Sequence, residues 1–299
     1  MKRLQCMVTG LLLLGCASAN AAQAPEPVNF FVGQAEVTVL QDMPGQMETG
    51  LFRGASAEEL KAKAPSGKAE AGVHVFMVKN NGKTILIDAG YGFNDQDRVS
   101  ALPALLQKTG VKPESVDIVL LTHMHGDHIG GLLRDGKALF PNAQIKVSEP
   151  ELAFWTDEKT ARDYPDRTKN IAMVNDVRAA YGKKMTSFAF GDEVAPGLTA
   201  RDTRGHTPGH TLFLLSSGKG KLYFWGDLVH SAAFQFANPE ICAVYDMDMP
   251  QAVSTRRTVM ESAARENIPV AGAHLPYPAV GRVVSDAKSR NFAYLPGLK

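Results

Sequence analysis

The chain has 299 residues, and its shares of hydrophobic (44%), charged (21%) and aromatic (8%) residues are those of an ordinary globular protein. The formal net charge of +1 changes to −1 without residues 1–21, because that stretch carries two basic residues and no acidic one. A nearly neutral chain without a run of lysine or arginine lacks the electrostatic footprint for nucleic acid or anionic lipid. We therefore expect a small-molecule substrate and no nucleic-acid partner.

The first residues have the composition of a secretory signal. Lys2 and Arg3 precede an apolar run centred on 11–14, and small residues follow. The apolar run is too short to span a membrane, whereas a basic start and a short apolar stretch are typical of a signal peptide. We expect residues 1–21 to be a signal peptide and the protein to be periplasmic or secreted.

Two processing routes are compatible with this beginning. Cleavage after the A-x-A sequence at 19–21 would release a protein without an anchor. The sequence LLGC, which ends at Cys16, resembles a lipoprotein signal and would anchor the protein through that cysteine instead. After A-x-A cleavage, a single domain over 22–299 would keep only Cys242, so no internal disulfide could form.

After the signal, the apolar stretch AEVTVLQD at 35–42 comes first, and a β-hairpin is predicted after it. Its strands are expected over 73–78 and 84–88, because both runs are apolar and Asn81-Gly82 between them favours a tight turn. The preceding segment, 44–72, is polar and rich in alanine, glycine and lysine. We expect that segment to be an irregular loop.

The rest of the chain alternates between strand and helix patterns. A helix is predicted over 95–110, ending at Gly110, although Pro103 lies within it. Strands are then predicted over 115–122, 143–149, 197–205, 211–217, 221–227 and 269–275, and helices over 149–155, 163–181 and 250–268. Strands followed by helices, twice over, indicate two mixed sheets that face each other with helices outside.

Histidine and aspartate gather where the apolar strand over 115–122 ends. The sequence THMHGDH contains His123, His125, Asp127 and His128. Side chains at the end of a strand can converge on a ligand while the sheet holds them rigidly. Imidazole and carboxylate are ligands for Zn²⁺ and similar divalent ions. The cluster therefore predicts a metal site, and a solvated histidine-rich loop is the alternative.

Three later residues repeat this pattern and disfavour that alternative. His206 lies in RGHTPGHT, Asp227 in LYFWGD and His274 in VAGAHL, and each comes soon after an apolar strand. We expect these side chains to join the first cluster at the ends of neighbouring strands.

These seven residues resemble the signature of the metallo-β-lactamase superfamily, and the resemblance covers nearly all of the chain after the signal. It implies an α+β fold, a four-layer αββα sandwich of two mixed β-sheets with outer helices. It also implies a first metal held by His123, His125 and His206, a second held by Asp127, His128 and His274, and Asp227 bridging both.

The implied activity is metal-dependent hydrolysis. Two divalent ions, Zn²⁺ first among them and Mn, Co or Fe as alternatives, would share a water and make hydroxide available near neutral pH. The hydroxide would attack a carbonyl or phosphoryl centre, and Asp127 would orient it or shuttle its proton. The relatives also imply a homodimer.

Longer stretches resemble the secreted branch that contains methyl parathion hydrolase and lactonases. These stretches are THMHGDHIGGL, FPNAQIKVSEPELAFW, GHTPGHT, GDLVHSAAFQFANPE and AHLPYPAVG. Trp155 and Phe93 match aromatic positions that line the leaving-group pocket in this branch, and ordinary core packing is the other interpretation of both.

His230 departs from the patterns of this branch. Acyl-homoserine lactonases carry a tyrosine three residues after the bridging aspartate, and organophosphate hydrolases carry an apolar residue there. An imidazole at this place would hydrogen-bond an oxyanion or protonate a leaving alkoxide; a structural histidine bonded to backbone is the alternative. We therefore expect lactone or carboxylic ester hydrolysis, with phosphotriesters as a side activity.

Several other functions remain open. An organophosphate hydrolase and a β-lactamase use the same chemistry, although the familiar zinc β-lactamases lack an aspartate at the position of Asp227. A mononuclear-iron oxidoreductase, like the persulfide dioxygenases of the superfamily, and a non-catalytic metal-binding protein are alternatives of other classes. Three further residues are interpreted as structural: His210 as support of the fold or of the surroundings of His206, His74 within a strand, and Cys242 as a packed thiol.

Overall fold

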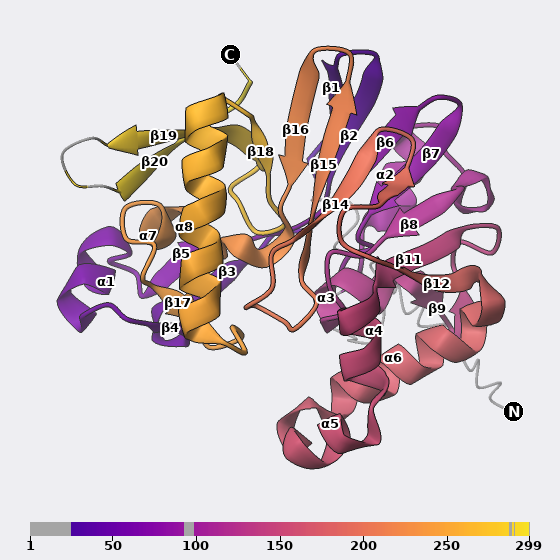
Figure 1. Cartoon of the computed structure of the whole chain (residues 1–299), viewed down its shortest axis with the longest axis horizontal. Helices are drawn as coiled ribbons and strands as arrows, with labels where there is room; N and C mark the ends of the chain where they lie inside the picture. Colours follow the sequence, from indigo (N-terminus) through magenta and orange to yellow (C-terminus); the bar gives the residue numbers. More distant parts are fainter. Residues whose placement is uncertain (1–24, 93–98, 287–288, 290, 299) are drawn as a thin grey trace, which may run out of the picture.

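The computed structural model describes residues 25–92, 99–286, 289 and 291–298. Over these residues two seven-stranded sheets face each other, and helices cover their outer sides (Figure 1). The expected four-layer αββα sandwich is confirmed. The predicted signal peptide, with Cys6 and Cys16, lies outside the described residues. No helix in the described part of the chain combines the length and hydropathy of a membrane span.

The first sheet joins an antiparallel half to a parallel half. Its strands in spatial order are β1 (Val28–Val32), β2 (Ala35–Met43), β6 (Val73–Asn80), β7 (Lys83–Ile87), β8 (Ile118–Leu120), β11 (Gln144–Ser148) and β12 (Met185–Phe188). Strands β1 to β7 pair antiparallel, and β7 to β12 pair parallel. The predicted hairpin is confirmed, because Asn81 and Gly82 take positive φ between β6 and β7, as a two-residue turn of this kind requires.

The second sheet is antiparallel except where β16 pairs with β18. Its strands in spatial order are β13 (Glu193–Ala195), β14 (Leu198–Asp202), β15 (Thr211–Ser217), β16 (Gly220–Phe224), β18 (Val270–Ala271), β19 (Val280–Asp286) and β20 (Asn291–Pro296). The main helices are α2 (Leu102–Lys108), α4 (Glu149–Thr156), α6 (Thr168–Tyr181) and α8 (Met249–Glu266). Helix α8 packs on β19 of this sheet, while α2, α4 and α6 lie on the first sheet.

Strand β6 shows why its sequence is an unbroken apolar run. Phe76 and Val78 point into the core between the two sheets, whereas Val75 and Met77 belong to the core beneath the helices. A strand that is covered on both faces needs apolar side chains at every position rather than at alternate ones.

The segment 44–72 is more regular than expected, so the prediction of an irregular loop is wrong. It contains the short strands β3 (Gln46–Glu48), β4 (Phe52–Arg53) and β5 (Lys68–Glu70), and helix α1 (Ala57–Lys63). Ser56 caps this helix by accepting the backbone N–H of Glu59 at 3.1 Å. Leu60 is the one buried residue of the helix, which leaves almost no apolar periodicity for sequence analysis to detect.

Helix α2 begins later than predicted, at Leu102. Pro103 therefore lies in its first turn, where the missing N–H and fixed φ of proline are tolerated. Gly110 follows the helix with a φ of +73°, as the predicted end requires. Residues 95–98, at the start of the predicted range, lie outside the described part of the chain.

Candidate metal centre

The seven predicted ligands lie where strand ends of the two sheets meet. Strand β8 of the first sheet leads into His123. Helix α3 (Gly126–Ile129) begins directly after His125 and carries Asp127 and His128. His206, Asp227 and His274 follow β14, β16 and β18 of the second sheet. The site therefore depends on both sheets, and each sheet contributes a rigid part of it.

The structure brings the seven side chains into two groups. When one ring nitrogen or carboxylate oxygen is taken from each residue, the atoms of the first group all lie within 4.8 Å of one another. The same holds for the second group. The first group is His123, His125, His206 and Asp227; the second is Asp127, His128, Asp227 and His274. These are the two sets that the family resemblance implies, with Asp227 in both.

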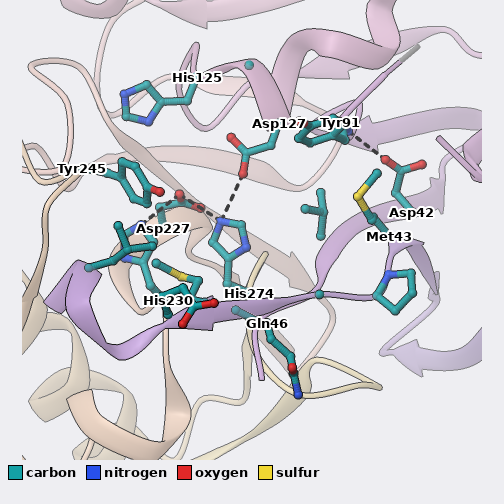
Figure 2. A pocket seen from close by; sticks show the side chains of 18 of the residues that line it. Asp42, Met43, Gln46, Tyr91, His125, Asp127, Asp227, His230, Tyr245 and His274 are labelled. Atoms are coloured by element: carbon teal, nitrogen blue, oxygen red, sulfur yellow. Dashed lines mark hydrogen bonds and ion pairs between the residues drawn. The ribbon is translucent and has the colours of Figure 1, made fainter. Parts of the chain in front are cut away.

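Asp227 lies at the centre of the two groups. Its Oδ2 atom is 3.1 Å from His274 Nε2 and 3.4 Å from His206 Nε2. Its Oδ1 atom is 3.0 Å from His128 Nε2. Figure 2 shows His274 between Asp227 and Asp127, whose Oδ2 atom is 3.4 Å from His274 Nε2. One carboxylate thus faces imidazoles from both groups.

Hydrogen bonds on the outer side of four imidazoles fix their tautomers. The Nδ1 atom of His206 donates to Asp246 Oδ1 at 2.8 Å, and that of His274 donates to the carbonyl of Gly72 at 2.7 Å. His128 Nδ1 lies 2.8 Å from Asp88, and His123 Nδ1 lies 3.1 Å from the hydroxyl of Thr122. Each ring therefore presents its Nε2 atom to the centre. Hydrogen-bond partners on the outer side orient metal-binding histidines in the same way.

This arrangement fits divalent cations. His123 Nε2 and His206 Nε2 are 3.2 Å apart, yet both rings carry their proton on Nδ1, so two lone pairs face each other. The buried atoms His128 Nε2 and Asp227 Oδ1 pair with each other at 3.0 Å and have no other hydrogen-bond partner among the described residues. Unsatisfied polar atoms are costly in a buried site, and a cation would satisfy all of them.

Burial and neighbouring charges shift the pKa of histidines in opposite directions in the two groups. Burial, reinforced by His128, lowers the pKa of His123 well below its ordinary value, and burial and His206 do the same for His125. Burial also opposes charge on His128, but Asp227 and Asp88 outweigh it and raise the pKa of His128 well above its usual range. His123 and His125 are therefore neutral imidazoles, the form that binds metal.

The second group is more strongly ionised. Asp227 outweighs burial at His274 and raises the pKa of that imidazole to about 9. At Asp227 burial acts in the opposite direction, but His128 and His274 outweigh it and hold the pKa of the carboxyl well below its usual range. A metal entering this group would displace protons from its histidines.

Two residues hold Asp227 and its surroundings in place. The backbone N–H of Asp227 donates to His210 Nε2 at 3.1 Å, and the His210 ring lies edge-on to that of His206 with centroids 5.7 Å apart. Gly226, with a φ of +52°, precedes it, and a Cβ atom there would lie 2.7 Å from His210 Nε2. Only glycine lets the chain pass this close to the ring.

His230 faces the same centre. Its Nε2 atom lies 3.3 Å from Asp227 Oδ2, and its ring stacks on that of His274 with centroids 5.4 Å apart. The ring is 2% exposed, and neither nitrogen has a hydrogen-bond partner among the described residues. The alternative of an imidazole bonded to backbone is therefore not what the structure describes.

A cavity of about 1250 Å³ opens over the two groups. Its floor includes Asp127, His230 and His274, and Tyr245 lies beside them (Figure 2). The walls include Met43, Met47, Leu51, Val99, Arg167 and Met173. The centre is thus accessible to a molecule larger than water.

The two predicted aromatic pocket residues have different outcomes. Trp155 is fully buried and packs edge-on against His125 at 5.6 Å, in the core beneath the helices and not on the cavity wall. Phe93 lies outside the described residues.

The other residues interpreted as structural are buried. The ring of His74 lies 2.8 Å from the carbonyl of Ala273, and burial lowers the pKa of that histidine to about 4. Cys242 is a free buried thiol, and burial raises its pKa.

Apart from His210, the residues that hold the ligands from outside are not among those predicted from the sequence. Asp88 directly follows strand β7, so the signal that identified Asp227 was also present for Asp88. Asp246 follows no strand of comparable length, and no local pattern marked it. Arg256 of helix α8, which binds Asp246 at 3.2 Å, sits in an ordinary helical pattern.

Known proteins share this architecture. The structure of hydrolase AbOPH in the beta-lactamase superfamily has a TM-score of 0.86 and 29% identity, covering 93% of this chain and 99% of that one. AidC, a dizinc quorum-quenching lactonase in complex with the product N-hexanoyl-L-homoserine, has a TM-score of 0.83 and 27% identity, covering 92% and 98%.

Comparisons of sequence also find hydrolases and lactonases among the similar proteins. An N-acyl homoserine lactonase of Bacillus cereus is 27% identical over 128 residues, which is 43% of each chain. The chain spans less than two thirds of the length of the curated relatives it matches, reaching 62% for an uncharacterised protein of Bacillus subtilis. A model of the metallo-beta-lactamase superfamily matches residues 70–263, which is well over half of the sequence. The chain therefore belongs to the metallo-beta-lactamase superfamily.

Proposed function

We propose that the chain is a hydrolase with two divalent metal ions that opens lactones or cleaves carboxylic esters. The observation that carries the proposal is the pair of ligand groups that share Asp227 at the floor of the cavity. His123, His125 and His206 would hold one ion, and Asp127, His128 and His274 the other. The similarity to a dizinc lactonase supports both zinc and the substrate class.

The bound ions would lower the pKa of a water molecule and polarise the carbonyl oxygen of the substrate. Asp127 is the ligand carboxylate with the greater exposure, 28% of its side chain, and it lines the cavity. Its Oδ2 atom can orient the attacking water and accept its proton. A neutral His230 carries one N–H, which can donate to the oxygen that leaves when the acyl bond breaks.

The walls of the cavity support an acyl-bearing substrate. Met43, Met47 and Met173 line it, and methionine side chains adapt their shape to apolar groups of varied length. A volume of about 1250 Å³ leaves space for such a group in addition to the reacting ring.

Two further proposals concern the branch of the superfamily and the processing of residues 1–21. We place the chain in the secreted branch with methyl parathion hydrolase and lactonases, and the 27% identity to the lactonase AidC over 92% of the chain supports the lactonase part of this assignment. We also propose that residues 1–21 direct export and are removed, leaving one domain over 22–299.

A substrate panel on metal-analysed protein tests the function. We expect two metal ions per chain, turnover of acyl-homoserine lactone and aryl lactone, slower turnover of methyl paraoxon, and loss of all activity with chelator. Faster turnover of methyl paraoxon or nitrocefin than of any lactone would make the organophosphate hydrolase or β-lactamase the better assignment. One iron per chain together with oxygen uptake would select the oxidoreductase, and no turnover by the metal-loaded protein would refute a hydrolase.

A further inference from the structure

Glu151 is a carboxylate wholly enclosed by the protein. It lies in the first turn of helix α4 and is 0% exposed. None of the ion pairs among the described residues includes it, so no basic side chain balances its charge there. A buried carboxylate without a cation needs several hydrogen-bond donors, and their positions indicate what it does.

Four donors meet the two oxygens of Glu151. The Oε1 atom accepts the backbone N–H of Met124 at 2.9 Å and the indole N–H of Trp155 at 2.7 Å. The Oε2 atom accepts the hydroxyl of Thr207 at 2.7 Å and the backbone N–H of Gly209 at 2.9 Å. Each oxygen thus binds two donors, which is the full capacity that an ionised carboxylate offers in one plane.

Three of these donors, those of Met124, Thr207 and Gly209, belong to the two loops that carry the first ligand group. Met124 lies between His123 and His125, and Thr207 directly follows His206. These loops are 83 residues apart in sequence, yet they bring His206 Nε2 within 2.9 Å of His125 Nδ1. The carboxylate of Glu151 lies behind both loops and binds each of them.

The start of helix α4 holds the second loop at a further point. Ser148, which caps the helix, donates to the carbonyl of Gly209 at 2.6 Å. A Cβ atom on Gly209 would lie 2.2 Å from the backbone nitrogen of Glu151. The loop is therefore pressed against the helix, and glycine is required for this approach.

We propose that Glu151 is a positioning residue that sets the spacing of the three histidines in the first metal group. It acts through Met124 on one loop and through Thr207 and Gly209 on the other. The proposal rests on the metal-binding part of the proposed function and is independent of the substrate.

A carboxylate is needed here, and an amide of the same shape does not replace it. In Glu151→Gln the amide nitrogen donates instead of accepting. The hydroxyl of Thr207 can reverse its hydrogen bond, but the N–H of Gly209 then loses its acceptor. The opposite orientation leaves two N–H groups, those of Met124 and Trp155, without an acceptor. Either orientation removes at least one hydrogen bond that holds a histidine loop in place.

Zinc titration of the metal-free chain against a chromogenic chelator tests this proposal. We expect wild-type protein to bind two Zn²⁺ ions. In Glu151→Gln, one of the two should bind about tenfold to a hundredfold more weakly, the range found for partners behind metal ligands. The affinity of the other ion should stay within about threefold.

Asp42→Asn is the matched control for loss of a buried carboxylate. Asp42 is 1% exposed and accepts the N–H groups of Tyr91 and Leu102 and the hydroxyl of Ser100, but it binds neither histidine loop. We expect this variant to lose thermal stability and to keep both zinc affinities.

Thr207→Val supplies a second measurement if Glu151→Gln does not fold. It removes one donor without changing side-chain volume much and should weaken one Zn²⁺ severalfold. Two wild-type zinc affinities in Glu151→Gln, or in Thr207→Val as the only folded variant, would overturn the positioning proposal alone. Equal weakening of zinc in Asp42→Asn would overturn it too. Failure of the wild-type chain to bind zinc would overturn the proposed metal centre, and this proposal with it.

Discussion

Arg256 is a buried arginine that connects helix α8 to the candidate metal centre. It is 1% exposed and donates to Asp246 at 3.2 Å, while Asp246 accepts from His206, a candidate metal ligand. Its remaining N–H groups donate to the carbonyls of Leu228, Pro239 and Ile241 at 2.7–3.0 Å. We consider the variant Arg256→Met, which keeps most of the apolar stem and removes every one of these donors.

The structure sets the size of the expected effect. In Arg256→Met the carboxylate of Asp246 remains buried and loses its cation, and removal of one partner of a buried ion pair costs about 3–5 kcal/mol. We therefore expect the free energy of unfolding to fall by about that amount. Arg257→Met is the matched control, because the adjacent Arg257 pairs with Glu240 on the surface, where such a pair contributes about 1 kcal/mol or less.

Urea denaturation of the metal-free variants, followed by circular dichroism, measures these losses. The double variant Arg256→Met with Asp246→Asn should lose less than the sum of the single losses, because no buried charge is left unpaired. A loss below about 1 kcal/mol for Arg256→Met, or strict additivity in the double variant, would refute the reasoning.

Three further predictions concern the site and its surroundings. His74→Asn keeps a donor for the carbonyl of Ala273 but cannot titrate. Because the folded pKa of His74 is about 4 against 6.5, the native state resists a proton that the unfolded state binds, and wild-type stability falls as pH drops from 6.5 to 4. In the presence of chelator, the free energy of unfolding should lose about 3 kcal/mol less over this pH range in His74→Asn than in the wild type. Parallel curves of stability against pH for the two proteins would contradict a lowered pKa of His74. His230→Leu should depress lactone turnover more than methyl paraoxon turnover, so equal losses would count against a proton-donating His230. Chelation should lower the thermal midpoint, and zinc at about 1,000 times its dissociation constant should restore about 4 kcal/mol, whereas an unchanged midpoint would argue against a metal-stabilised fold.

Local patterns account for much of the fold. The Asn81-Gly82 turn could be predicted because its positive φ values depend on those two residues alone. Helix α1 could not, because it buries only Leu60 and depends on contacts with Phe52, Phe234 and Ile241 from other segments. A helix whose stability comes from distant partners leaves little trace in its own sequence.

The candidate ligands could also be predicted from the sequence, since each follows an apolar strand closely. Their spatial grouping follows from the fold, because strand ends from both sheets meet at one edge. The residues behind them could not be found this way. Glu151 reaches loops that lie 27 and 56 residues from it along the chain, and Asp246 reaches His206 across 40 residues.

The chemistry of the site can be predicted from local sequence, whereas its arrangement depends on contacts between distant segments. Residue types and their place after strands are local properties, so the sequence predicts the family, the donor set and the metal-binding character. The tautomer of each imidazole, the partner of His210 and the place of Trp155 in the core follow from contacts between distant segments. Those contacts form only when the two sheets and their helices pack together, because hydrogen bonds and burial depend on distance in space and not on separation along the chain.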